Sequence, residues 1–227
     1  KANGFGGTDI ELKFNDQPRI KLIQMFADWS KDKTFVYGGR EAKSDPMFNG
    51  GECAFRIGSS GSAAGAEKAL GADKVGIGMM PYSPDVIAKP QNSIIGGATL
   101  WVLQGKPKDE YAGVAKLFTY LSRGDVQAKW HQETGYVPIT TSAADITEKA
   151  GFYKTNPGRD IAVKQLMLNA PTENSKGLRI GLFVQIRDVI EDELGQAFAG
   201  RKPPKAALDM AVRRGNELLR RFEKANQ

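Results

Sequence analysis

The stretch Gly181-Leu182-Phe183-Val184-Gln185-Ile186-Arg187-Asp188-Val189-Ile190 predicts the start of an amphipathic helix and places one guanidinium there. The apolar residues follow the i, i+3, i+4 spacing of a helix that buries one face: Ile186, Val189, Ile190, Leu194 and Phe198. Arg187 is expected in the first turn, where the helix dipole disfavours a cation. A phosphate or carboxylate bound there would satisfy both the guanidinium and the free backbone N–H groups. The alternative is an ion pair with Asp188, Glu191 or a more distant carboxylate.

The composition indicates a globular protein, and its positive net charge favours anionic binding partners. The 227 residues are 41% hydrophobic, which is enough for a sizeable core and for one or two domains. The net charge is +6 and the pI is about 9.3, but cations and carboxylates alternate almost everywhere. The densest basic run, residues 213–221, lies on a predicted helix with an apolar opposite face, and we expect it to be a solvated outer surface. We therefore expect no nucleic-acid partner.

The residues of nucleophilic and metal chemistry are scarce. A single cysteine, Cys53, excludes an internal disulfide, and we expect it to be a buried strand thiol. A single histidine, His131, is expected on the polar side of a helix that ends at Gly135. The carboxylates of residues 191–193 occupy successive helix positions and cannot converge on one metal or one reacting bond. We expect no catalytic residue, no metal and no cofactor.

Helices and strands are predicted to alternate. The expected helices cover residues 17–31, 63–70, 110–123 and 126–134, and the expected strands cover residues 53–57, 75–80 and 93–104. Residues 58–62, Gly-Ser-Ser-Gly-Ser, lead into a helix and form an anion cradle in outline, although a simple helix cap explains them equally well. The pair Gly96-Gly97 indicates either a bulge or a close approach by a ligand.

No apolar run is long enough to span a membrane, and the first residues, which lack Met and any signal pattern, suggest a processed or incomplete chain.

Four strings are more specific than any single loop: GIGMMPY (residues 76–82), PQNSIIGGA (90–98), WHQETGYVPIT (130–140) and RRGNELLRRF (213–222). In sequence and in order they resemble the periplasmic sn-glycerol-3-phosphate-binding proteins of ATP-driven importers, in extracellular solute-binding protein family 1. The resemblance spans essentially the whole chain but matches only the C-terminal portion of such proteins. We therefore expect an N-terminal half to be absent.

The resemblance implies a fold: an α/β chain of the two-lobe, type II periplasmic-binding-protein class, which closes on its solute like a flytrap. Residues 1–92 and 141–227 would form the C-terminal lobe. Residues 93–140 would be a segment of the N-terminal lobe, with hinge crossings at its ends. The apolar segment 94–103 would then lack sheet neighbours in this chain, and we expect it to be exposed unless the N-terminal half or a second copy covers it.

The resemblance also implies a set of ligand contacts. They fall on Ser59 or Ser60, on Gly97, on Tyr136 and on Arg187; the serine is ambiguous because a one-residue insertion before Gly76 would shift it. A phosphate monoester carries a charge of about −1.5 to −2 at neutral pH and suits a guanidinium, a phenol, a hydroxyl and backbone N–H groups. Purely structural roles stay open for three of these residues: Arg187 could form an ion pair, Tyr136 could pack at the hinge, and Gly97 could form a bulge.

The resemblance finally implies partners and a compartment. The ligand would be glycerol-3-phosphate or its choline diester, the protein partners would be the permease subunits of the importer and the missing N-terminal half, and the location would be the periplasm. The main alternative function is that of a solute-binding protein for another ligand such as an oligosaccharide, since proteins of one fold bind many different ligands. An enzyme acting on a phosphate ester is a weaker rival.

Overall fold

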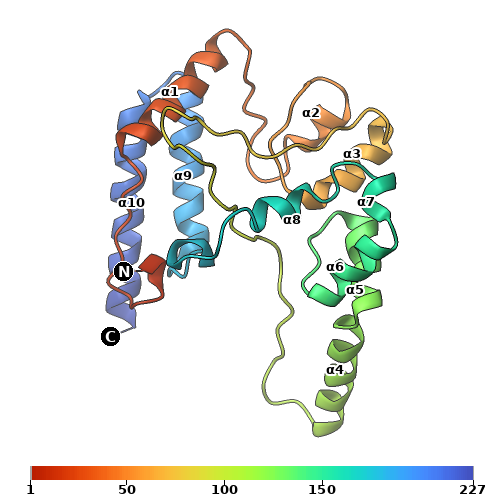
Figure 1. The fold of residues 1–227 in the computed structure, drawn as a ribbon. Helices are drawn as coiled ribbons and strands as arrows, with labels where there is room; N and C mark the ends of the chain where they lie inside the picture. The colour runs from red at the N-terminus through yellow and green to blue at the C-terminus, as the bar shows by residue number, and fades with distance from the viewer. Residues whose placement is uncertain (1, 227) are drawn as a thin grey trace. The chain divides into compact units, whose positions relative to one another are not determined.

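The computed structural model describes residues 2–226 as helices joined by extended segments. The helices are α1 (Gln17–Lys31), α2 (Asp45–Asn49), α3 (Ala63–Leu70), α4 (Lys108–Leu121), α5 (Gly124–Thr134), α6 (Thr141–Lys149), α7 (Phe152–Thr155), α8 (Ile161–Leu166), α9 (Phe183–Phe198) and α10 (Pro204–Ala225), with 3-10 turns η1 (Ala2–Gly4), η2 (Ser60–Ser62) and η3 (Glu173–Lys176) (Figure 1). The four predicted helices are confirmed within a few residues at their ends. No helix in this range is both long and apolar enough to cross a membrane.

The predicted strands are wrong for this structure, because residues 2–226 contain no β-strand. Residues 53–57, 75–80 and 93–104 are mostly irregular chain, and a strand requires a neighbouring strand to satisfy its backbone groups. Some of these backbone groups form hydrogen bonds with side chains instead of with a neighbouring strand. For example, the Met80 N–H donates to Oε1 of Gln165 at 3.0 Å. Of the expected α/β architecture, residues 2–226 thus contain the helices but not the β-sheet.

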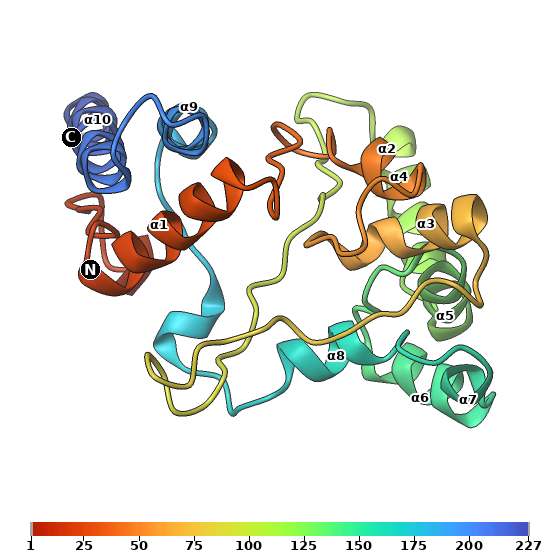
Figure 2. The ribbon, with the colours of Figure 1, turned by 90° about the horizontal axis from the view of Figure 1, so that it is seen from above.

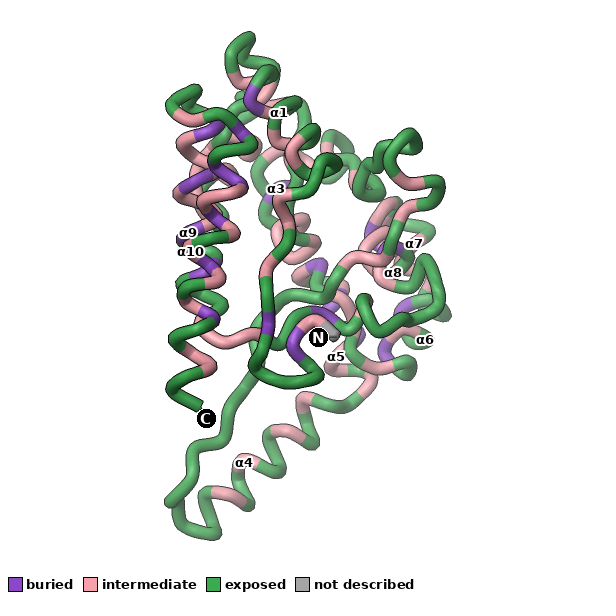
Figure 3. Tube along the Cα trace, turned by 90° about the vertical axis from the view of Figure 1, so that its left-hand side faces the viewer, coloured by how far each residue is buried: buried purple, intermediate pink, exposed green. Residues whose placement is uncertain are grey.

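The apolar segment 94–103 is exposed, as expected for a strand without neighbours. Trp101 is 86% exposed and Leu103 is 70% exposed. Figure 3 shows the extended chain that leads into α4 as continuously exposed. Cys53 is half-buried rather than buried, because the strand expected to enclose it does not form.

The chain divides into two compact units, which are described separately. The first unit contains residues 1–44, 84–88 and 171–227. In it α9 and α10 run side by side and α1 crosses them, as Figure 2 shows with α9 and α10 seen end-on. Its core consists of Ile10, Ile186 and Leu219, and Asn216 of α10 holds the N-terminal segment by accepting the Leu12 N–H at 2.7 Å. In the basic run of α10, Arg213 and Arg221 are exposed as expected, but Arg214 is half-buried against α9 and Arg220 donates to the Ile10 carbonyl, so the expectation of a solvated outer surface holds only in part.

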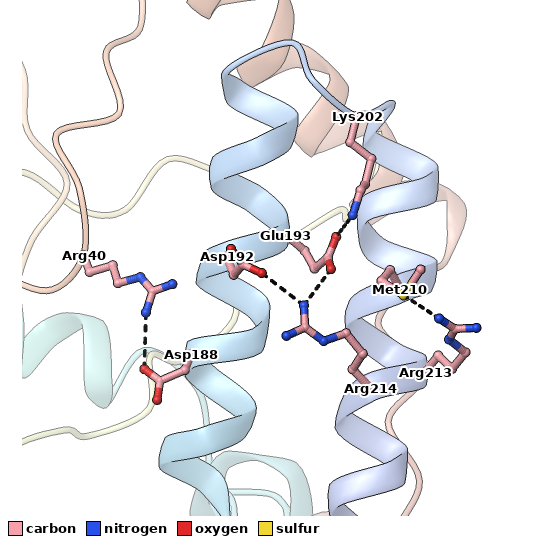
Figure 4. A network of polar contacts seen from close by, with 8 residues as sticks. All are labelled: Arg40, Asp188, Asp192, Glu193, Lys202, Met210, Arg213 and Arg214. Atoms are coloured by element: carbon pink, nitrogen blue, oxygen red, sulfur yellow. Dashed lines mark hydrogen bonds and ion pairs between the residues drawn. The ribbon is translucent and has the colours of Figure 1, made fainter.

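A buried carboxylate joins α9 to α10 in this unit (Figure 4). Glu193 is 2% exposed, and its carboxylate accepts hydrogen bonds from Lys202 and, at 2.8 Å, from Arg214. Hydrogen bonds from Arg214 to Asp192 and Glu193 raise the pKa of the Arg214 guanidinium. Because a buried carboxylate is costly without partners, these two cations are needed for the helices to pack here.

The second unit contains residues 45–83 and 89–170. Helix α5 packs against α6 and α3, and the buried residues at these contacts include Ala66, Ala128 and Ala143, whose small side chains allow close approach. Helix α5 ends at Gly135, which adopts the left-handed conformation at φ +85°. This predicted cap is confirmed, and it turns the chain toward Tyr136.

Candidate functional site

The serine turn (residues 59–62) opens the helical segment that continues as α3. Ser59 is the cap: its Oγ accepts the Gly61 N–H at 3.3 Å, and its carbonyl accepts the Ser62 hydroxyl at 2.6 Å. The Ser60 side chain is half-buried, and its hydroxyl has no hydrogen-bond partner within the described range. Of the two serines that the sequence could not separate, Ser60 is the one whose Oγ takes part in no hydrogen bond within the described range, whereas Ser59 Oγ is held at the turn as an acceptor.

Tyr136 lies against this turn although it is far away in the sequence. A Cβ built on Gly61 would lie 2.7 Å from Cζ of Tyr136, so the ring contacts the bare backbone of the turn. The Tyr136 residue remains 46% exposed. On the other side, a Cβ built on Gly135 would lie 2.5 Å from the Ser60 carbonyl oxygen. Two glycines thus permit the contact between the serine turn and the end of α5.

His131 fixes the backbone at Tyr136. The prediction that this histidine lies on a polar helix side is wrong, since it is only 2% exposed. Its Nδ1–H donates to the Tyr136 carbonyl, and its Nε2 accepts the Tyr153 hydroxyl at 2.9 Å. Burial lowers the pKa of His131 and the nearby charge of Arg159 lowers it further, against the opposing hydrogen bond to Tyr136. The neutral imidazole is therefore a structural link.

The burial of His131 had a signal in the sequence. Ala128, His131 and Gly135 are all buried and follow the i, i+3, i+7 spacing of one helix face. The polar character of the histidine and of its neighbours Lys129 and Gln132 obscured this pattern.

Two arginines flank the serine turn, and neither was singled out from the sequence. Arg56 donates to the Ser62 hydroxyl at 3.0 Å and pairs with Asp45 at 2.8 Å. Arg159 donates from Nη2 to Oε2 of Glu67 at 2.6 Å, with the arginine side chain only 8% exposed. The partners of Arg159 are distant in the sequence, so no local pattern could have revealed this pair.

Gly97 lies in the extended segment of the second unit. Its φ is +140°, a value that residues with a side chain rarely adopt, and no heavy atom lies within 4 Å of the place where its Cβ would be. Because no strand forms around it, the bulge that the sequence allowed has no ladder to interrupt.

Arg187 lies in the first unit, in the second turn of α9 rather than in the first. The prediction placed it too early because the helix already begins at Phe183, after Leu182 in the left-handed conformation at φ +53°. Its side chain is 54% exposed, and its Nη2 lies 3.7 Å from Oε1 of Glu191. The ion-pair alternative thus has a partner in the structure, but at this exposure and distance the pair is weak.

The candidate residues supply groups suited to an anion. They offer a free hydroxyl at Ser60, a phenol at Tyr136, an open backbone at Gly97 and a guanidinium at Arg187. Within residues 2–226, no group of three or more His, Cys, Asp and Glu side chains is arranged to hold a metal ion.

Comparisons with known proteins place this chain among binding proteins. Residues 3–160 match the family described as bacterial extracellular solute-binding protein. The whole chain is 48% identical to the sn-glycerol-3-phosphate-binding periplasmic protein UgpB of Yersinia pseudotuberculosis, 47% identical to that of Salmonella typhimurium and 48% identical to that of Escherichia coli. The chain covers 52% of each of these relatives, which is about half of their length.

Proposed function

The chain belongs to the bacterial extracellular solute-binding protein family, and from this premise we propose that it forms part of a periplasmic receptor for sn-glycerol-3-phosphate. In this proposal the receptor delivers its solute to the permease subunits of an ATP-driven importer. The choline diester of the same solute is an alternative ligand, and no catalytic step takes place. The 48% identity across the full chain is the observation that carries the proposal.

The geometry at the serine turn supports a phosphate ester as the ligand. The free Ser60 hydroxyl and the half-exposed Tyr136 ring lie on the same part of the second unit. We propose that Ser60, rather than Ser59, donates to a phosphate oxygen together with the Tyr136 phenol, because Ser59 Oγ is held toward the Gly61 N–H as the cap of the turn, whereas Ser60 Oγ is held by no hydrogen bond within the described range. Gly97 contributes its backbone N–H, and Arg187 contributes charge.

We also propose the lobe assignment that the family resemblance implies. Residues 93–140 belong to the N-terminal lobe of the receptor, and residues 1–92 and 141–227 belong to its C-terminal lobe. The exposed apolar residues of segment 94–103 are then covered by the part of the family's length that this chain does not span. Tight binding requires that part as well, because a two-lobe receptor gains affinity when both lobes contact the solute.

Calorimetric titration tests the proposal. It uses the chain extended to the length of its curated relatives, called the full-length protein below, with glycerol-3-phosphate, glycerophosphocholine, inorganic phosphate and maltose as separate ligands. We expect saturable binding of one or both glycerol phosphates and none of maltose. A response to maltose alone would contradict the proposal in favour of an oligosaccharide receptor.

A further inference from the structure

The guanidinium of Arg159 is buried although only some of its N–H groups have hydrogen-bond partners within residues 2–226. The whole residue is 9% exposed, and in the part of the chain that the structure describes Glu67 is its one carboxylate partner. Its Nε and Nη1 atoms are buried and have no hydrogen-bond partner within residues 2–226. A buried cation with unused N–H groups costs free energy, so its place in the fold requires a reason.

Arg159 lies where three parts of the candidate site meet. Through Glu67 it holds α3, the helix that follows the serine turn. Its Nη1 lies 2.8 Å from the place where a Cβ on Gly135 would be, and the Ser60 carbonyl lies 2.5 Å from the same place. The guanidinium therefore faces the serine turn, the end of α5 and α3 together.

We propose that Arg159 is a positioning residue for the ligand site. Its pair with Glu67, in the second turn of α3, holds this helix so that its first residue, Ala63, lies against Gly135, and thereby sets the distance between the Ser60 hydroxyl and the Tyr136 phenol, which the phosphate ester bridges. The inference rests on the proposed function and adds to it a residue that does not itself touch the ligand.

Glu67 distinguishes positioning from simple attraction of charge. If Arg159 only supplied positive potential, then Glu67→Gln would remove an opposing negative charge and tighten the binding of an anion. If the pair positions the turn, Glu67→Gln breaks the same clamp as Arg159→Met, and both changes weaken binding. The two explanations predict opposite signs for one substitution.

The test measures glycerol-3-phosphate affinity of the full-length protein by calorimetry, with circular dichroism and thermal unfolding for each variant. We expect Arg159→Met and Glu67→Gln each to weaken binding at least about tenfold, the scale of one unsatisfied buried partner. Arg123→Gln is the matched control, because Arg123 pairs with Asp125 at 2.7 Å in the same unit but is 57% exposed. It should change affinity less than about twofold.

A double-mutant cycle with Ser60→Ala separates positioning from loss of general stability. Because Arg159 acts through the turn, Arg159→Met combined with Ser60→Ala should bind no more weakly than Ser60→Ala alone, whereas independent effects would multiply. Multiplying effects, unchanged affinity in Arg159→Met, or tighter binding by Glu67→Gln would each overturn the inference. If Arg159→Met does not fold, the sign of the Glu67→Gln effect decides. Failure of the unsubstituted protein to bind glycerol-3-phosphate would instead overturn the proposed function, and this inference with it.

Discussion

Gly135→Ala should destabilise the protein because two independent costs meet at this position. The alanine would have to adopt φ +85°, which costs about 1–2 kcal/mol for a residue with a Cβ. Its Cβ would also lie 2.5 Å from the Ser60 carbonyl oxygen, and overpacking of this kind costs about 1–3 kcal/mol. After the gain of about 0.4–1 kcal/mol from a stiffer unfolded chain, we expect a net loss of about 1–5 kcal/mol.

Gly151→Ala is the matched control. Gly151 has φ +70° in the same unit, but nothing lies within 4 Å of its Cβ position, so only the backbone cost applies. Urea unfolding of both variants of the full-length protein should show Gly135→Ala less stable than Gly151→Ala by about 1–3 kcal/mol, with an unchanged m-value. Glycerol-3-phosphate affinity should fall only in Gly135→Ala, because the serine turn must move. Equal stability losses would refute the packing of the end of α5 on the serine turn.

Three further predictions concern single residues of the site. Arg187→Ala should weaken glycerol-3-phosphate binding by about 2–5 kcal/mol in calorimetry, yet lower stability by less than about 1 kcal/mol because its side chain is 54% exposed; an unfolded variant would make Arg187 a structural residue. His131 has a lowered pKa in the fold, so its contribution to stability is complete above about pH 6.5 and is lost as pH falls toward the lowered value. His131→Gln should therefore flatten the dependence of unfolding free energy on pH just below 6.5, and an unchanged slope would contradict the burial of a neutral imidazole. Gly97→Ala and Gly97→Val both carry the backbone strain of φ +140°, so their thermal midpoints should fall by similar amounts, while affinity in calorimetry should fall further in Gly97→Val because its larger side chain enters the ligand's space; equal affinities of the two variants would assign the glycine to folding.

Helices were predictable from sequence because their signals are local. Asp16 and Pro18 mark the start of α1, and Gly135 marks the end of α5, so each boundary is specified within one turn of chain. The start of α9 was misplaced because Leu182, an apolar residue without glycine's freedom, adopts the left-handed conformation.

Strands and the support of the site were not predictable in the same way. The apolar pattern of residues 93–104 records a preference for a sheet, but a sheet also needs neighbouring strands, and no strand is formed in the described part of the chain. The pairing of Arg159 with Glu67, and the contact of Tyr136 with Gly61, depend on helices brought together by tertiary packing. Family resemblance could nominate the ligand residues, but not the buried groups beneath them.

A crystal structure of the full-length protein with glycerol-3-phosphate tests most directly the claim that this chain supplies the phosphate-binding residues. We expect phosphate oxygens within hydrogen-bond distance of the Ser60 hydroxyl, the Tyr136 phenol and the Arg187 guanidinium. A ligand that contacts none of the three, or one held by Ser59 while Ser60 faces solvent, would contradict it.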